Sequence, residues 1–121
     1  MISKALYITI ILIIFNNYLF SQINNLVKNP SFEEFTLCPD NQGDIYLASN
    51  WFSGCYWNPD YYNSCNLDTM MFSTPKNGCT FQLPKSGVAY AGIHIYSYVN
   101  DLREYIATKL KYPLTENNMF F

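Results

Sequence analysis

The sequence predicts an all-β fold, and three observations lead to that class. Tyrosine and phenylalanine are abundant, with 11 and 9 copies, and aromatic side chains favour strands. Asn, Ser, Gly and Pro interrupt the chain at short intervals, as they do in the turns between strands. Residues 88–96 alternate with a period of two, which is the period of a half-buried strand. No segment has the pattern of a long helix.

The N-terminal segment, residues 1–21, has the pattern of a cleavable secretory signal peptide. Lys4 precedes an apolar run over residues 5–15, and Ser21 supplies a small residue for cleavage. An uncleaved membrane anchor is the alternative, but an Asn pair ends the run before the roughly 18 apolar residues that a span needs. We therefore expect residues 22–121 to be secreted or on the outer cell surface, without membrane insertion.

The charge of this mature segment argues against nucleic acid as a partner. Without Lys4 it has six basic and nine acidic residues, a net charge of −3. Nucleic-acid binding draws its affinity from clustered Lys and Arg, and the chain has no such cluster.

The mature segment contains four cysteines: Cys38, Cys55, Cys65 and Cys79. An even number behind a signal peptide predicts disulfides in an oxidising compartment, and four cysteines allow three pairings. A zinc site is the alternative, but it needs closely spaced cysteine pairs. These gaps are far longer, and the single His94 completes no ligand set.

The first half of the mature segment is expected to be mostly irregular. A short strand is predicted at 25–27, and an extended segment at 32–35 follows a turn at 29–31. Trp51 and Phe52 are expected to form a buried aromatic anchor between two irregular regions. These regions are 38–50 and 53–87, and a loop as long as the second favours a binding surface or disulfide pinning.

The second half contains the clearest strand, Val88–Tyr96. Its alternation places Ala89, Ala91, Ile93 and Ile95 on the core face. A second strand is predicted from Glu104 to about Lys111, and a third begins at 119–121, where the sequence stops. An apolar strand opening there would leave a sheet edge unpaired, so we expect the chain to be a fragment of a longer protein.

Several ordered segments carry a family resemblance. They are Asn25-Leu26-Val27, Asn29-Pro30-Ser31-Phe32-Glu33-Glu34, Cys38-Pro39, Trp51, Pro59-Asp60-Tyr61-Tyr62-Asn63-Ser64-Cys65, Gln82, Pro84, Ser86-Gly87, Ala89-Tyr90-Ala91-Gly92, Arg103-Glu104-Tyr105-Ile106, Leu110 and Pro113-Leu114. Together they resemble the N-terminal jelly-roll domain of secreted surface proteins from Gram-negative bacteria with the gliding type of secretion system.

The resemblance implies a jelly-roll β-sandwich, galactose-binding-like and similar to carbohydrate-binding modules, incomplete here at its C-terminus. It implies a disulfide between Cys38 and Cys65. Cys55 and Cys79 lie where the sequence departs from the family pattern, so we expect Cys55–Cys79 as an added bridge. The resemblance further implies a structural calcium near Glu33, since Ca²⁺ takes carboxylate oxygens. A solvent-facing carboxylate is the other interpretation of Glu33. Such domains are often followed by an OmpA-like or C-terminal sorting domain, and neither is present in these residues.

Nothing in the pattern predicts an enzyme. His94 lies between two tyrosines in the predicted strand and has no evident partner. Glu33 and Glu34 are adjacent, so in an extended segment they point to opposite faces. The chain has no nucleophile-elbow, zinc-protease or phosphate-loop motif.

Glycan binding is the function we expect, because sugars stack their C–H faces on aromatic rings and need planar polar partners for their hydroxyls. The candidate residues are Tyr56, Trp57, Asp60, Asn63, Gln82 and Arg103. Tyr56 and Trp57 are the best candidates for an exposed stacking platform, whereas Asn63 has an alternative role in satisfying loop backbone. The expected protein is thus a non-catalytic glycan-binding or adhesion module. The alternative is a structural envelope module that positions a downstream domain.

Overall fold

The computed structural model describes residues 25–98 and 101–116. Val27–Pro113 form one compact unit, and all elements below belong to it; the chain ends belong to a second unit. The predicted signal peptide and the predicted strand at 119–121 lie outside the described residues.

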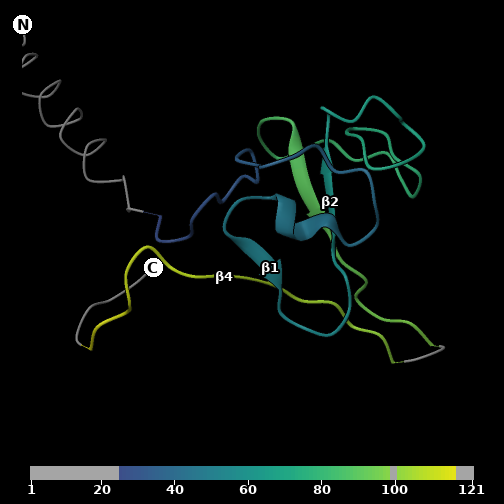
Figure 1. The fold of residues 1–121 in the computed structure, drawn as a ribbon. Helices are drawn as coiled ribbons and strands as arrows, with labels where there is room; N and C mark the ends of the chain where they lie inside the picture. The colour runs from purple at the N-terminus through teal and green to yellow at the C-terminus, as the bar shows by residue number, and fades with distance from the viewer. Residues whose placement is uncertain (1–24, 99–100, 117–121) are drawn as a thin grey trace, which may run out of the picture. The chain divides into compact units, whose positions relative to one another are not determined.

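The described part of the chain is all-β, as predicted, with four short strands and one 3-10 turn (Figure 1). The elements are η1 (Asp44–Leu47), β1 (Trp51–Ser53), β2 (Asp60–Asn63), β3 (Ala89–Gly92) and β4 (Ile106–Thr108). β1 pairs antiparallel with β4, and β2 pairs antiparallel with β3. η1 contacts both β1 and β2, so it connects the two small sheets.

β3 is shorter than the predicted strand Val88–Tyr96 because its partner ends. Asp60 pairs with Gly92 at the end of the ladder, and Pro59 precedes Asp60. Proline has no N–H to donate, so the ladder cannot continue past this pair. The expected burial of Ile93 and Ile95 was therefore wrong: they are 47 % and 81 % exposed.

β4 is also shorter than the predicted strand from Glu104 to Lys111. Trp51 pairs with Thr108 at one end of the ladder, and the preceding Asn50 has a φ of 71°. This left-handed conformation ends the extended backbone of β1, so β4 has no partner beyond Thr108.

Two elements lie in regions that were expected to be irregular. η1 lies within 38–50, and β2 lies within 53–87. All four residues of β2 are buried, so the strand lacks the apolar–polar alternation by which a half-buried strand is recognised. The short strand expected at 25–27 is not formed.

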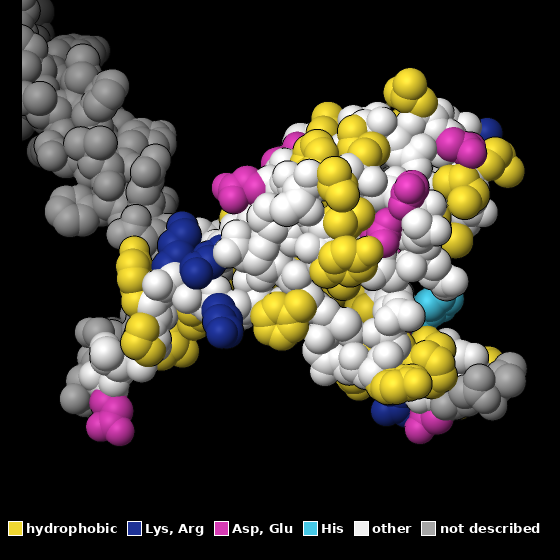
Figure 2. Space-filling view, in the orientation of Figure 1, with side chains coloured by type: hydrophobic (Ala, Val, Ile, Leu, Met, Phe, Trp, Pro, Cys, Tyr) yellow, Lys and Arg dark blue, Asp and Glu magenta, His cyan; other side chains and the backbone are white. Residues whose placement is uncertain are grey.

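The core is small and centres on one tyrosine. Tyr61 is fully buried and packs with Leu47, Ala48 and Ala89. Phe32 and Trp51 cover this cluster, and their rings stack with centroids 4.6 Å apart. The predicted aromatic anchor is thus half right, because Trp51 packs on the core whereas Phe52 is 44 % exposed. Many other apolar side chains lie on the surface (Figure 2).

Asn29 organises the N-terminal segment of the unit. Its side-chain Nδ2 donates to the carbonyls of Glu34 and Ser49 at 2.7 and 3.0 Å, and its Oδ1 accepts from the N–H of Glu34 at 3.0 Å. Its own carbonyl accepts from the indole Nε1 of Trp51 at 2.8 Å. Asn29 and Phe32 both have positive φ, at 45° and 64°, which is uncommon for Asn and rarer for a bulky residue. These bonds hold the strained turn in place.

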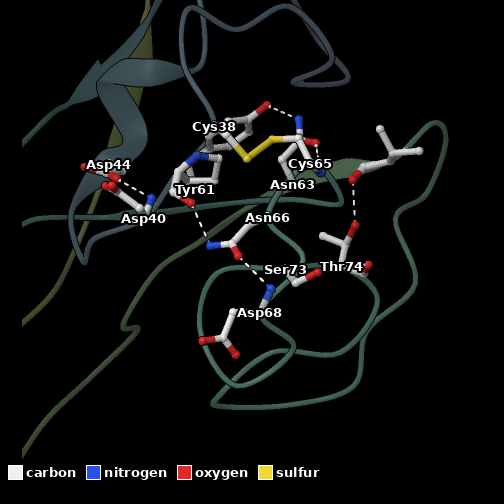
Figure 3. Close-up of a disulfide and its surroundings, with 12 residues drawn as sticks. Cys38, Asp40, Asp44, Tyr61, Asn63, Cys65, Asn66, Asp68, Ser73 and Thr74 are labelled. Carbon is white, nitrogen blue, oxygen red and sulfur yellow. Dashed lines mark hydrogen bonds between the residues drawn. A yellow bond between two sulfur atoms is a disulfide. The ribbon is translucent and has the colours of Figure 1, made fainter.

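A disulfide joins Cys38 to Cys65 (Figure 3), and this pairing was predicted from the resemblance. Two hydrogen bonds flank it: Asn66 Nδ2 donates to the carbonyl of Pro39, and Asn63 Oδ1 accepts from the N–H of Cys65. The bond indicates a non-cytoplasmic environment, because cytosolic thiols are kept reduced. Within the described ranges, no helix has the length and apolar character to span a membrane.

Candidate functional site

A cleft of about 300 Å³ lies against the β2–β3 sheet. Its lining is drawn from three parts of the chain that are distant in sequence: β2, the loop from 77 to 82, and β3 with the residues after it. The lining side chains that can form hydrogen bonds or react are Asp60, Tyr62, Asn77, Cys79, Gln82, Tyr90 and His94.

Asp60 is the first residue of β2, and both oxygens of its carboxylate accept hydrogen bonds. Its Oδ1 accepts from the backbone N–H of Gly43 at 2.8 Å, and its Oδ2 accepts from the hydroxyl of Tyr62 at 3.2 Å. Gly43 precedes η1 with a φ of 85°, so the Asp60 carboxylate also anchors the loop that contains η1. The residue is 9 % exposed.

Two tyrosine rings form an aromatic wall of the cleft. Tyr62 and Tyr90 are cross-strand partners in the β2–β3 register, and their ring centroids lie 5.2 Å apart with planes tilted by 31°. Gly92 makes room for the first ring, since a Cβ there would lie 2.7 Å from Tyr62 Cε2. A side chain larger than hydrogen at Gly92 would therefore displace this wall.

Asn77 fixes the loop that faces the sheet. Its Oδ1 accepts from the backbone N–H groups of Cys79 and Thr80, both at 2.9 Å. Its Nδ2 donates to the hydroxyl of Tyr90 at 2.6 Å. The side chain thus shapes the loop as an Asx turn and ties it to β3 in the same contact.

Both tyrosines of the cleft keep their protons at neutral pH. Burial, and then the charge of the Asp60 carboxylate, hold the pKa of Tyr62 far above its ordinary value. Burial also raises the pKa of Tyr90, although the hydrogen bond from Asn77 acts in the opposite direction. The hydroxyls are consequently neutral donors and acceptors over the physiological range.

The structure brings together two of the predicted glycan-binding residues, Asp60 and Gln82, in this cleft. Tyr90, Asn77 and Cys79 were not predicted as glycan-binding residues, and neither was the pairing of Tyr90 with Tyr62. The sequence does mark Tyr62 and Tyr90 as candidate stacking rings, because both lie in segments rich in tyrosine. Their pairing depends on the β2–β3 register, which no local pattern specifies.

The other four predicted residues lie elsewhere. Asn63 is 1 % exposed, and its Nδ2 donates to the hydroxyl of Tyr61 at 2.8 Å, so it serves the core. Tyr56 is 92 % exposed, as expected, but its ring meets that of the half-buried Trp57 at 81°. An edge-on pair at this angle does not present one flat platform.

Arg103 lines a second, mainly apolar hollow of about 500 Å³, together with residues that include Ile95 and Tyr96. Its guanidinium pairs with Asp101 at 3.1 Å and lies 5.7 Å from the centre of the Tyr96 ring. The side chain is therefore committed to a local ion pair and a cation–π contact, and it does not line the cleft beside Asp60.

Backbone N–H groups engage the carboxylate of Glu33, the residue that the resemblance implied as a calcium ligand. Its Oε1 accepts from the backbone N–H groups of Val88 and Ala89, at 2.9 and 3.0 Å. Among the described residues, no three His, Cys, Asp or Glu side chains form a group that could hold a metal ion. The carboxylate ties the N-terminal segment to the start of β3. Gly87 leaves space for it, because a Cβ at that position would overlap the Glu33 side chain.

The second predicted disulfide, Cys55–Cys79, is not formed, and both thiols are free. The two residues belong to different neighbourhoods, which explains the error. Cys55 Sγ accepts from the N–H of Tyr105, next to the β1–β4 pair, at 3.3 Å, whereas Cys79 lines the cleft beside β2 and β3.

Cys55 is predicted to be a reactive thiol. Desolvation acts to raise its pKa, but hydrogen bonding with the Ser53 hydroxyl and with backbone groups of Tyr105 and Trp57 outweighs it, so the pKa of Cys55 lies below its ordinary value. Because the thiolate is the nucleophile, Ser53→Ala should slow alkylation of Cys55 by iodoacetamide at pH 7 and move the rate profile to higher pH. Peptide mass spectrometry of the full chain measures both.

The exposed Ser86 provides a matched control for this prediction, since its hydroxyl is not among the hydrogen-bond partners of Cys55. Cys79 in the same sample serves as an internal reference. An unchanged pH profile for Cys55 in Ser53→Ala would contradict the assigned role of the Ser53 hydroxyl.

The cleft contains a thiol and an imidazole, yet no catalytic pair is formed among the described residues. No hydrogen bond joins the His94 ring to Cys79 in the part of the chain that the structure describes, and only the backbone of His94 is bonded, to Glu104. A nucleophile and its base need contact at about 3 Å. The cleft combines polar side chains with an aromatic wall.

Comparison with known proteins adds no further assignment: no family model, curated protein or solved structure matches this chain.

Proposed function

We propose that this chain is a non-catalytic, extracellular glycan-binding module and that the cleft beside β2 and β3 is its binding site. One observation carries the proposal: aromatic rings and planar polar groups line the same small cleft. Tyr62 and Tyr90 supply the rings, and Asp60, Asn77 and Gln82 supply carboxylate and amide groups. Binding sites for small ligands combine such apolar walls with a few placed polar groups.

The polar groups differ in how much of their bonding capacity is used internally. Asn77 is engaged on both its oxygen and its nitrogen. Gln82 is exposed, and its Nε2 makes one bond, to the adjacent carbonyl of Leu83 at 2.9 Å. The Oε1 of Gln82 therefore has capacity for a sugar hydroxyl, as do the two phenol groups. Gln82 is the polar residue whose replacement disturbs the protein least.

We further propose that this binding module is a jelly-roll domain of an exported envelope protein. The resemblance over residues 25–114 supports that fold, and the Cys38–Cys65 bond supports an oxidising location. A structural module that positions a downstream OmpA-like or sorting domain is the alternative function. The two are separated by whether any glycan stabilises the folded chain.

The test is calorimetric titration of the full chain against a panel of soluble polysaccharide oligomers, followed by two matched variants. Gln82→Ala should weaken binding about fivefold, as expected when one hydrogen bond of about 1 kcal/mol is lost. Gln42→Ala, at an exposed glutamine that does not line the cleft, should leave the affinity unchanged.

Two outcomes would overturn the proposal in different ways. If no oligomer binds or raises the melting temperature, the structural envelope function is favoured. If binding occurs but is lost in Tyr56→Ala and retained in Gln82→Ala, the site lies at the Tyr56–Trp57 pair, and the cleft is not the binding site.

A further inference from the structure

The charge of the cleft comes from one carboxylate without an ionic partner. Of the described residues that line the cleft, none is Lys or Arg, and His94 is the one basic side chain. The salt bridge found in the described ranges joins Arg103 to Asp101, outside the cleft lining. Asp60 is therefore a nearly buried carboxylate without an ion pair among the described residues, and such a group favours the approach of a cation.

Asp60 also has bonding capacity to spare. Each of its oxygens accepts one hydrogen bond, from Gly43 N–H and from Tyr62 O–H. An ionised carboxylate offers about four lone-pair positions, so roughly half of them are left for a donor on a bound molecule. An ammonium group supplies up to three N–H donors and a full positive charge.

The aromatic wall favours the same ligand chemistry. The faces of tyrosine rings carry negative charge density and attract cations within about 6 Å of the ring centre. Tyr62 is 6 % exposed and its ring already contacts those of Phe72 and Tyr90, so the half-buried Tyr90 is the ring of this pair that a cationic group can approach. A sugar ring can stack on one face while its amine approaches Asp60.

A second negative charge is disfavoured in the same place. After burial, the Asp60 carboxylate is the main cause that keeps the Tyr62 phenol from ionising. A carboxylate on a bound sugar would meet the same repulsion, because like charges a few ångströms apart destabilise each other wherever water is displaced.

We infer that the Asp60 cleft selects sugars that carry a protonated amine and rejects sugars that carry a carboxylate. The inference deepens the proposed glycan-binding function and rests on it. The ligand class is amino-sugar polymers with free amines, the neutral N-acetylated forms bind more weakly, and uronic-acid polymers are excluded.

The test compares three oligomers of similar length in calorimetric titrations of the full chain at pH 7. They are a glucosamine oligomer with free amines, the same oligomer fully N-acetylated, and an oligouronate. The free-amine oligomer should bind about tenfold tighter than the acetylated one, since hydrogen bonds to charged groups contribute more than those between neutral groups. This advantage should shrink as salt is added, and the oligouronate should not bind.

A charge-matched pair of variants locates the effect. Asp60→Asn keeps an oxygen for the Gly43 N–H and removes the charge, so it should abolish the preference for free amines while the acetylated oligomer still binds. Asp68→Asn removes one charge at an exposed residue that does not line the cleft, and it should retain the preference. Far-ultraviolet circular dichroism checks that both variants are folded. If a variant is not folded, the comparison of the three oligomers on the unchanged chain still tests the selectivity.

The outcomes distinguish a failure of glycan binding from a failure of selectivity. If no oligomer of any charge binds, the proposed glycan function fails and this inference fails with it. If the acetylated oligomer or the oligouronate binds as tightly as the free-amine oligomer, glycan binding stands and the selectivity is wrong. If Asp68→Asn lowers the preference as much as Asp60→Asn, the net charge of the chain causes the effect and the assignment to Asp60 is overturned.

Discussion

Tyr61→Ala is expected to lower the free energy of unfolding by about 4 kcal/mol, the middle of the range for truncating a buried aromatic residue. Tyr61 is 0 % exposed and packs with Leu47, Ala48 and Ala89. Its hydroxyl also donates to the carbonyl of Phe32 at 2.8 Å. The change would leave a cavity, and the core is too small to fill it by rearrangement without losing other packing contacts. Urea denaturation followed by fluorescence gives the free energy.

Two controls separate the contributions to this effect. Tyr61→Phe keeps the ring and should cost about 1–2 kcal/mol, because Asn63 and Phe32 lose one hydrogen-bond partner each. Tyr112→Ala, at a residue that is 57 % exposed, should stay within about 0.5 kcal/mol of the original chain. If the Ala and Phe variants at Tyr61 were equally stable, the packing of the ring would not be what holds the core.

Removal of the Cys38–Cys65 bond is expected to lower the free energy of unfolding by about 3–4 kcal/mol. The bond closes a loop with a sequence separation of 27, and in the chain-entropy model a loop of this length gives a stabilisation of that size. This contribution is a large share of the total free energy of unfolding, because a domain with a small hydrophobic core has few other sources of stability. Cys38→Ser combined with Cys65→Ser, measured by the same urea titration, tests it.

The free cysteines provide the matched control for this prediction. Cys55→Ser combined with Cys79→Ser removes two sulfurs that form no bridge, and it should change the free energy of unfolding by less than about 1 kcal/mol. A reductant should shift the unfolding midpoint of the original chain and leave that of the Cys38/Cys65 variant unchanged. An equal response of both proteins to reductant would show that this bond does not stabilise the fold.

The sequence allowed the fold class and part of the core to be predicted, because these depend on composition and on local turns. The disulfide partner of Cys38 and the packing role of Trp51 were inferred from the family resemblance and the aromatic pattern, and both are confirmed. Strand ends were missed where a neighbouring strand determines them. Ile93 leaves the sheet because Pro59 stops the opposite strand, and no window around Ile93 contains that information.

The candidate site was predicted less well, for a related physical reason. Asp60 and Gln82 were named because carboxylates and amides suit sugar hydroxyls, and they do line one cleft. The pairing of Tyr62 with Tyr90 into its wall was not predicted, because the two rings meet only through the pairing of β2 with β3. Cys79 was assigned to a bridge that would have required it to reach a thiol beside Tyr105.

The turn around Asn29 has a consequence for the chemical ageing of the protein. Asparagine deamidates when the backbone nitrogen of the next residue attacks the side-chain amide, and the product is an aspartate or its isomer. At Asn29 that product would place a carboxylate against the carbonyls of Glu34 and Ser49, which now accept from Nδ2. The next residue is Pro30, whose nitrogen carries no hydrogen and cannot complete the attack. The Asn29 amide, which bonds to the backbone of Glu34 and Ser49, is therefore protected from deamidation by its own neighbour in the sequence.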